Sequence, residues 1–250
     1  MERFDGKIAL ITGGSGDIAC STAERLLQEG ATVILCSRSE ERLKEEADKL
    51  AAKGYEGKIS YVACDALDYD GMVKAAEEIK EKYGRIDVLV CSQGILIHKP
   101  IDVLTLDEWQ KVVDVNMTSV FYSIKAVVPI MKEQQYGRIV MVSSIGGRRG
   151  RPGVGVNYAA SKAGLVGMTQ LLAYELGPWN ITVNCVAPGP LEGRMFRSLT
   201  EEQVARLKDG TRIQRLGKVS EAAAAIAYLA SDDAAWTTGE ILDVNGGLQY

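Results

Sequence analysis

The chain has 250 residues, 46% of them hydrophobic and 25% charged, a composition typical of a globular protein that buries a sizeable core. Its net charge is −4, and no helix rich in lysine or arginine offsets that charge, so nucleic acid is not expected as a partner. The five cysteines lack a Cys-x-x-Cys pair, which argues against a disulfide or zinc framework and favours free thiols in a reducing compartment.

The first apolar strand begins within a few residues of the N-terminus, with no charged-then-apolar leader before it. No apolar stretch approaches the length needed to span a membrane. These features predict a cytoplasmic protein without a membrane partner. The single histidine, His98, excludes a multi-histidine metal site and argues against a Ser/His/Asp triad, so no metal is expected; we place His98 in a solvated loop.

Short runs rich in Val, Ile and Leu alternate with longer segments of helical periodicity along the whole chain. This alternation predicts a parallel sheet that is covered by helices on both faces. The expected fold class is α/β, a doubly wound, Rossmann-type, three-layer fold with a seven-stranded parallel sheet. Residues 1–250 are expected to form one domain. The predicted strands are 7–12, 32–36, 59–64, 88–91, 138–143, 182–186 and 241–244.

Two helix starts carry the pattern of a capping box, namely Ser37 with Glu40 and Thr105 with Glu108. The irregular segment 146–155 (GGRRGRPGVG) is too short to join domains. We interpret it as a loop of the active site.

A glycine-rich turn, Thr12-Gly13-Gly14-Ser15-Gly16, follows the first strand and leads into a helix. Glycines let the backbone approach a pyrophosphate, and the free N–H groups of the helix N-terminus attract its charge. The turn therefore predicts a dinucleotide site, although such turns also serve as plain strand-to-helix connections.

Tyr158 and Lys162 are four residues apart in a helical segment, so that the phenol and the ammonium share one face. A neighbouring cation favours the phenolate and is expected to lower the pKa of Tyr158 into the range useful for proton transfer to a carbonyl oxygen.

Over its full length the chain resembles the short-chain dehydrogenase/reductase family, in the short, single-domain variety. The resemblance rests on landmarks that occur in the family's order. After the glycine-rich turn these are Cys64-Asp65, Cys91-Ser-Gln-Gly94, Asn116, Ser143-Ser144, Tyr158 with Lys162, Pro188-Gly189, and Val244-Asn-Gly-Gly247.

The resemblance implies roles for four catalytic residues. Tyr158 is the general acid/base, Ser144 hydrogen-bonds the substrate oxygen, and Lys162 binds the nicotinamide ribose and lowers the pKa of Tyr158. Asn116 kinks its helix and holds a water that connects Lys162 to solvent. Ser143 is the alternative to Ser144, because the spacing to Tyr158 is one residue longer than the common pattern.

The cofactor is expected to be NADP(H) rather than NAD(H). An acid at the end of the second strand would accept hydrogen bonds from a ribose 2′-hydroxyl, whereas Ser37 and Arg38 stand there and arginine suits a 2′-phosphate; alternatively, Arg38 points into solvent. The full set of expected cofactor contacts is Gly13, Ser15, Gly16, Asp17, Ile18, Ser37, Arg38, Asp65, Ala66, Ser92, Gly94, Asn116, Tyr158, Lys162, Pro188, Gly189 and Leu191.

Three departures from the family pattern affect cofactor binding. Asp17 and Ala19 stand where glycines are usual, Cys91-Ser-Gln-Gly94 replaces the common Asn-Asn-Ala-Gly, and the threonine that often follows Pro188-Gly189 is absent. Asp17 is expected to compete with the pyrophosphate for the donors of the helix N-terminus and so to weaken cofactor binding.

The substrate is expected to be a small molecule with a carbonyl or secondary alcohol. Arg148 and Arg194 flank the expected pocket, together with Arg149 and Arg151, and we hypothesise that they bind an anionic group of the substrate; the alternative is a solvated loop or subunit contact. Reduction of a 3-oxoacyl thioester and conversion of a sugar or polyol are both open. A dinucleotide-binding sensor or scaffold without catalysis is the alternative from another class.

Two long helices, after Thr105 and after Asn157, are apolar on more than one face, and with the resemblance this predicts a homodimer or homotetramer. The segment 191–210 is expected to cover the substrate, to contain a short helix from Thr200, and to be the most mobile part.

Overall fold

The computed structural model describes residues 2–151, 153–194 and 200–248. Seven parallel strands form one sheet in the order β3-β2-β1-β4-β5-β6-β9. The strands are β1 (Ile8–Thr12), β2 (Thr32–Ser37), β3 (Ile59–Ala63), β4 (Val88–Cys91), β5 (Gly137–Val142), β6 (Ile181–Pro188) and β9 (Ile241–Val244). All seven predicted strands are present, and the expected Rossmann-type fold is confirmed.

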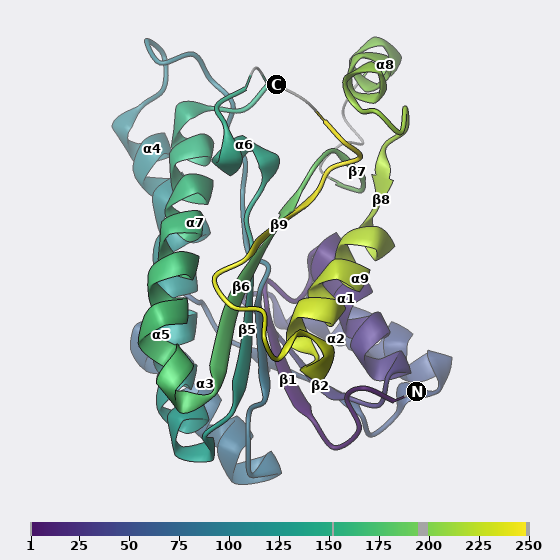
Figure 1. Ribbon diagram of the computed structural model, residues 1–250, viewed down its shortest axis with the longest axis vertical. Coiled ribbons are helices and arrows are strands. Elements are labelled where there is room, and N and C mark those ends of the chain that lie inside the picture. Colours follow the sequence, from purple (N-terminus) through teal and green to yellow (C-terminus); the bar gives the residue numbers. More distant parts are fainter. Residues whose placement is uncertain (1, 152, 195–199, 249–250) are drawn as a thin grey trace.

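Helices cover both faces of the sheet (Figure 1). One layer contains α1 (Asp17–Gln28), α2 (Glu40–Leu50) and α9 (Val219–Ala230); the other contains α3 (Tyr69–Tyr83), α4 (Leu106–Val113), α5 (Ser119–Gln134) and α7 (Val156–Leu176). In β1 the side chains of Ile8 and Leu10 pack against the α3/α5/α7 layer, and those of Ala9 and Ile11 against the α1/α2/α9 layer. Because both faces are buried, the inner strands β1, β2, β4, β5 and β6 are mostly apolar rather than alternating, which made them recognisable.

The two predicted capping boxes have different outcomes. Thr105 caps α4 with the reciprocal hydrogen bonds to Glu108 that the sequence predicted. The prediction for Ser37 was wrong: Ser37 is the last residue of β2, and Ser39 caps α2 by accepting from the N–H of Arg42. The strand continues one residue further than predicted because Ser37 still pairs with Ala63 of β3.

Shorter elements stand above the carboxyl ends of the strands (Figure 1). Part of the segment 146–155 forms the helical turn α6 (Ile145–Arg148). The strands β7 (Leu191–Glu192) and β8 (Gly217–Lys218) pair with each other and bracket α8 (Glu201–Gly210), which Thr200 caps as predicted. Elsewhere in the chain, the described residues also form the irregular turns η1 (Ala51–Tyr55), η2 (Asp114–Thr118), η3 (Gly177–Trp179) and η5 (Asp232–Ala234).

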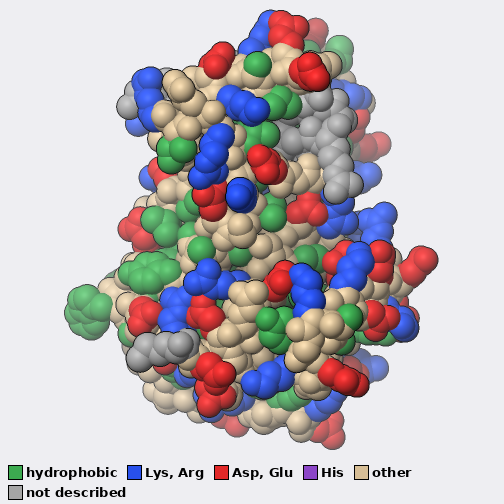
Figure 2. Space-filling view, turned by 90° about the vertical axis from the view of Figure 1, so that its right-hand side faces the viewer, with side chains coloured by type: hydrophobic (Ala, Val, Ile, Leu, Met, Phe, Trp, Pro, Cys, Tyr) green, Lys and Arg blue, Asp and Glu red, His purple; other side chains and the backbone are tan. Residues whose placement is uncertain are grey.

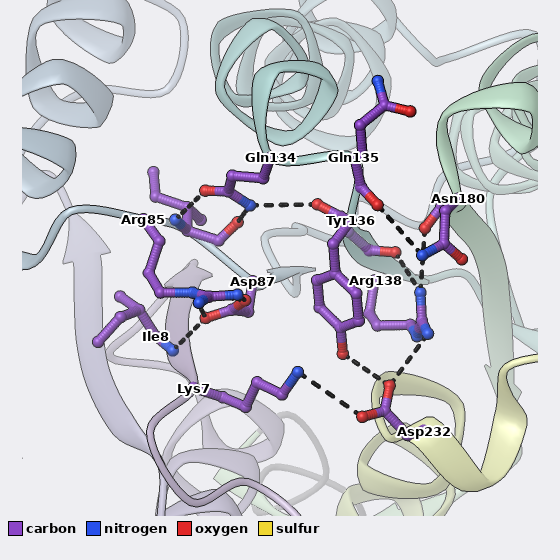
Figure 3. Close-up of polar contacts among 12 residues, drawn as sticks. Lys7, Ile8, Arg85, Asp87, Gln134, Gln135, Tyr136, Arg138, Asn180 and Asp232 are labelled. Carbon is purple, nitrogen blue, oxygen red and sulfur yellow. Dashed lines mark hydrogen bonds and ion pairs between the residues drawn. The ribbon is translucent and has the colours of Figure 1, made fainter.

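The amino ends of the strands are closed by polar side chains that pair with one another (Figure 3). Arg138, at the start of β5, is almost fully buried and donates to Asp232 at 3.0 Å. The Tyr136 hydroxyl donates to the same carboxylate at 2.8 Å. The buried carboxylate of Asp87 accepts from Arg85 and from the backbone N–H of Ile8. Most polar groups at this edge of the sheet therefore find their hydrogen-bond partners within the protein.

Candidate active site

The carboxyl ends of the central strands bring most of the predicted site residues to one edge of the sheet. Each of β1, β2, β4, β5 and β6 ends in a segment that the sequence analysis assigned to the site. In a parallel sheet these ends lie side by side, at the place where doubly wound folds bind their ligands. The residues gathered there include Gly13, Ser37, Ser92, Ser144 and Pro188.

The glycine-rich turn passes close to neighbouring backbone at two positions. Gly13 has a φ of +69°, and a Cβ on it would lie 2.6 Å from the backbone nitrogen of Gln93. A Cβ on Gly14 would lie 2.8 Å from the backbone nitrogen of Cys36. Both positions therefore require glycine. Gly16 is the N-cap of α1. Because glycine has no side chain, no N-cap side chain accepts a hydrogen bond from the first N–H groups of the helix.

Gln93 is a residue of the site that the sequence analysis did not assign. The Thr12 hydroxyl donates to its side-chain oxygen at 2.6 Å, and its amide nitrogen donates to the hydroxyls of Ser119 at 3.1 Å and Ser123 at 3.4 Å. Gln93 thus joins the end of β1 to α5 directly behind the glycine-rich turn. The available signal was its place in Cys91-Ser-Gln-Gly94, where an amide occupies the usual position of alanine.

Ser144 and Tyr158 lie together at the carboxyl end of β5. Burial raises the pKa of Tyr158, and a hydrogen bond with the Ser144 side chain acts in the opposite direction. The Ser143 hydroxyl instead donates to the backbone carbonyl of Lys162 at 2.7 Å and is buried. The structure therefore favours Ser144 over Ser143 as the partner of Tyr158.

Lys162 is buried on the same helix, one turn after Tyr158. Its ammonium nitrogen donates to the carbonyl of Val142 at 2.8 Å and lies 6.0 Å from the centre of the Tyr158 ring. Burial lowers the pKa of Lys162 to about 8. The pKa of Tyr158 is raised rather than lowered as the sequence analysis expected, because the burial of the phenol is the largest influence on it.

Asn116 lies in the π-helical turn η2 between α4 and α5, so the helix is irregular at this residue as the resemblance implied. Its side-chain oxygen accepts from the backbone N–H of Ile95 at 2.8 Å, and its amide donates to the Ile95 carbonyl at 3.0 Å. The amide also donates to Ser161 at 3.1 Å. Asn116 therefore fixes the segment after β4 against α7. The water that it is expected to hold stays a prediction.

Several features of this edge fit a dinucleotide. A Cβ on Gly94 would lie 3.2 Å from the Lys162 ammonium nitrogen, so the glycine leaves the space in front of this group open. The Ser37 hydroxyl is buried and has no hydrogen-bond partner among the described residues. Arg38 beside it is exposed. A buried hydroxyl without a partner is costly, and a ligand group would offset that cost.

The arginines that were hypothesised to bind substrate are separated. Arg148 is half-exposed and pairs with Asp243 at 3.1 Å. Arg194 contacts the glycine-rich turn, where its Nε lies 2.5 Å from the Asp17 carboxylate. Arg149 also takes part in a side-chain interaction. The face in Figure 2 carries acidic and basic side chains in alternation and no broad patch of one sign.

Other predicted features have the following positions. His98 is exposed in the loop after β4, as expected. All five cysteines are free thiols. Within the described ranges, no three His, Cys, Asp or Glu side chains are grouped closely enough to hold a metal ion. No described helix is both long and apolar enough to cross a membrane.

The chain is similar to proteins of one family over almost its whole length. A family model described as "Enoyl-(Acyl carrier protein) reductase" matches residues 14–249. The 3-oxoacyl-[acyl-carrier-protein] reductase of Thermotoga maritima is 40% identical over 98% of this chain and 99% of its own length. The acetoacetyl-CoA reductase of Allochromatium vinosum is 38% identical over 97% of this chain and 98% of its own length.

Solved structures agree with this relationship. The 3-oxoacyl-[acyl-carrier protein] reductase of Brucella melitensis superposes with a TM-score of 0.93 at 34% identity, and covers 99% of this chain and 92% of its own. Levodione reductase superposes with a TM-score of 0.92 at 30% identity, and covers 98% of both chains. The chain belongs to the short-chain dehydrogenase/reductase family, whose members are NAD(P)-dependent oxidoreductases acting on carbonyl or alcohol groups.

Proposed function

We propose that this protein is an NADP(H)-dependent reductase of 3-oxoacyl thioesters that uses Tyr158 as its general acid. The observation that carries the proposal is the grouping of Ser144, Tyr158 and the buried Lys162 at the carboxyl edge of the sheet, where β1 also ends in the glycine-rich turn. An acid, a hydrogen-bond donor and a cation at the mouth of a dinucleotide site are the groups that carbonyl reduction requires.

Tyr158, Ser144 and Lys162 have different roles in the reduction of the carbonyl group. Tyr158 donates its proton to the carbonyl oxygen as negative charge develops there, and Ser144 donates a hydrogen bond to the same oxygen. Burial raises the pKa of Tyr158, which keeps the phenol protonated and ready to act as an acid at neutral pH. Lys162, with its pKa lowered to about 8, is mostly charged at neutral pH, and its positive charge stabilises the phenolate that remains after the proton has been transferred.

The cofactor would lie along the carboxyl edge of the sheet. Its nicotinamide supplies the hydride when bound. Residues of the glycine-rich turn would hold the pyrophosphate, Lys162 the nicotinamide ribose, and Ser37 with Arg38 a 2′-phosphate. The Ser37 hydroxyl, which has no partner within the part of the chain that the structure describes, and the exposed Arg38 support NADP(H) over NAD(H). The adenine contacts proposed for Asp65 and Ala66, the adenosine contacts of Ser92 and Gly94, and the nicotinamide contacts of Pro188, Gly189 and Leu191 complete the site.

The substrate class follows from the relatives. Proteins named as reductases of 3-oxoacyl-[acyl-carrier-protein] and of acetoacetyl-CoA share 38–40% of this sequence over nearly the full length. Both names describe a ketone two carbons from a thioester. This likeness favours a 3-oxoacyl thioester over a sugar or polyol as substrate of the present chain.

A substrate panel tests the proposal. NADPH and NADH oxidation would be followed with acetoacetyl-CoA, with a 3-oxoacyl group on acyl carrier protein, and with sugar ketones as the competing set. We expect turnover of a thioester with NADPH. Turnover confined to the sugar ketones would overturn the assignment of a 3-oxoacyl thioester as substrate and favour a sugar or polyol. Binding of NADPH without turnover of any substrate would favour the non-catalytic sensor.

Assembly and location are part of the same proposal. Phe121 on α5 and both Leu171 and Tyr174 on α7 are exposed, which supports pairing of these helices with copies of themselves in a homodimer or homotetramer. Free thiols support a reducing, cytoplasmic location. We treat residues 1–250 as one domain because strands from Ile8 to Val244 join one sheet.

A further inference from the structure

Arg194 connects two parts of the molecule that are far apart in sequence. It follows β7, at the start of the segment 191–210 that is expected to cover the substrate. Its backbone N–H donates to the Asp17 carboxylate at 2.6 Å, and its Nε donates to the other oxygen of that carboxylate at 2.5 Å. An Nη group also donates to the backbone carbonyl of Ser15. The guanidinium therefore lies directly on the glycine-rich turn.

Two departures from the family pattern contact each other at this point. Asp17 stands where glycine is usual at the start of α1, and Gly193 lies in the stretch after Pro188-Gly189 where a threonine is often found. A Cβ on Gly193 would lie 2.8 Å from the Asp17 carboxylate oxygen. A side chain at 193 would have to displace the Asp17 carboxylate from this position, so Gly193 leaves room for the contact between Asp17 and Arg194.

The charges make the arrangement suitable for an anion. Asp17 alone would repel a pyrophosphate at the N-terminus of α1, and Arg194 neutralises that charge. A guanidinium has five N–H donors in a planar fork, and among the described residues the Nη1 group of Arg194 has no hydrogen-bond partner. Arg194 is 44% exposed and Asp17 29%, so a ligand on the turn has access to the remaining donors. Guanidinium groups bind phosphate oxygens in pairs of hydrogen bonds.

We propose that Asp17 and Arg194 form a latch on the cofactor pyrophosphate. Asp17 holds Arg194 over the glycine-rich turn, and Arg194 binds the pyrophosphate, so that β7 and the residues directly after it, Gly193 and Arg194, are tied to the bound cofactor. The inference rests on the proposed function, because it needs a dinucleotide on the turn. It assigns Arg194 to the cofactor rather than to an anionic group of the substrate, and it makes Asp17 a positioning residue rather than a simple obstacle.

A double-mutant cycle tests the latch through NADPH affinity, measured by nicotinamide fluorescence without substrate. Arg194→Ala should weaken NADPH binding at least about tenfold, because it removes a charged donor and leaves Asp17 unpaired. Asp17→Asn should weaken binding in the otherwise unchanged protein, since Arg194 loses its anchor. In the Arg194→Ala protein the same change should strengthen binding, since it removes a repelling charge. Strengthening in both backgrounds would overturn the latch.

Fragments of the cofactor locate the contact. Arg194→Ala should weaken binding of ADP-ribose, which contains the pyrophosphate but no nicotinamide. It should leave binding of adenosine 2′-monophosphate unchanged, because this probe lacks the pyrophosphate. Equal losses for both fragments would overturn the assignment of Arg194 to the pyrophosphate.

Arg206→Ala is the matched control, because Arg206 lies in the same segment, is exposed, and pairs only with Glu202 on its own helix among the described residues. It removes the same charge and should leave both affinities unchanged. If the unaltered protein binds neither NADPH nor NADH, the proposed function itself fails. If it binds NADPH normally and Arg194→Ala behaves as Arg206→Ala does, the latch alone is overturned.

Discussion

The two edges of the same sheet are built on opposite principles. At the amino edge, Asp232 accepts from both Tyr136 and Arg138, and the cations of Lys7 and Arg138 lie 3.9 and 4.3 Å from the centre of the Tyr136 ring (Figure 3). At the carboxyl edge, counting only described residues, the buried Lys162 ammonium has one hydrogen-bond acceptor, a backbone carbonyl, and the Ser37 hydroxyl has none.

The difference distinguishes polar groups that stabilise the fold from polar groups that are available to a ligand. A buried polar group contributes to stability when its partners are supplied by the protein, and it costs stability when they are not. The amino edge supplies most of its partners from described residues, the Nε of Arg138 and the hydroxyl of Thr182 being exceptions. The carboxyl edge leaves donors for a ligand. Substitutions at the amino edge should therefore change folding, and those at the carboxyl edge should change binding or turnover.

The largest expected effect is at the carboxyl edge. Tyr158→Phe removes the proton donor and keeps the ring, so kcat should fall by about a thousandfold, while Tm stays unchanged and NADPH affinity, to which the hydroxyl is one expected contact among many, changes far less than kcat. Steady-state kinetics and thermal unfolding measure the two halves of this prediction. Tyr174→Phe on the same helix is the control, because Tyr174 is exposed; a similar loss there, or substantial turnover left in Tyr158→Phe, would contradict the role of Tyr158.

A substitution at the amino edge should give the reverse result. Asp87→Ala leaves the Ile8 N–H without an acceptor and Arg85 without its partner, and should lower the free energy of unfolding by about 3 kcal/mol. Urea unfolding would measure this loss. Asp87→Asn keeps an acceptor for Ile8 and should lose less. The KM for NADPH should not change in either variant, and a shift in KM without loss of stability would break the distinction between the edges.

Cofactor choice gives a smaller effect at the carboxyl edge. Arg38→Ala should weaken NADPH binding by roughly tenfold and leave NADH binding unchanged, since the guanidinium is expected to contact a 2′-phosphate. Arg42→Ala removes an equal charge from the exposed side of α2 and should affect neither cofactor. Equal affinity of the unaltered protein for NADH and NADPH would contradict the assignment of NADP(H).

An effect of similar size is a pH dependence that comes from Lys162. Burial lowers its pKa to about 8, so the charged form is present below that pH and is lost as the pH rises through it. If the charged form binds the cofactor ribose, the Kd for NADPH should increase about tenfold between pH 7 and pH 9. Lys162→Arg keeps the charge throughout this range and should show a flat profile. A flat profile in the unaltered protein would refute the prediction.

The local signals in the sequence were reliable where a contact involves neighbouring residues. Tyr158 and Lys162 share a helix, and their four-residue spacing is enough to place them on a common face. Thr105 and Glu108 are three residues apart, and their capping box formed as predicted. Ser37 failed as a cap because strand pairing with β3 extended β2 through it, and that pairing depends on residues more than twenty positions away.

By itself, the sequence determined the order of strands and helices, the burial of the sheet on both faces, and the placement of Tyr158 and Lys162 on one face of a helix. These follow from periodicity, composition and short spacings, which are properties of neighbouring residues. Only the tertiary structure decided that Ser144 rather than Ser143 meets Tyr158, that Gln93 braces the glycine-rich turn, and that Arg194 reaches Asp17 across 177 residues of sequence. Such contacts depend on which chain segments the sheet brings side by side, and no pattern among neighbouring residues specifies which distant segments meet.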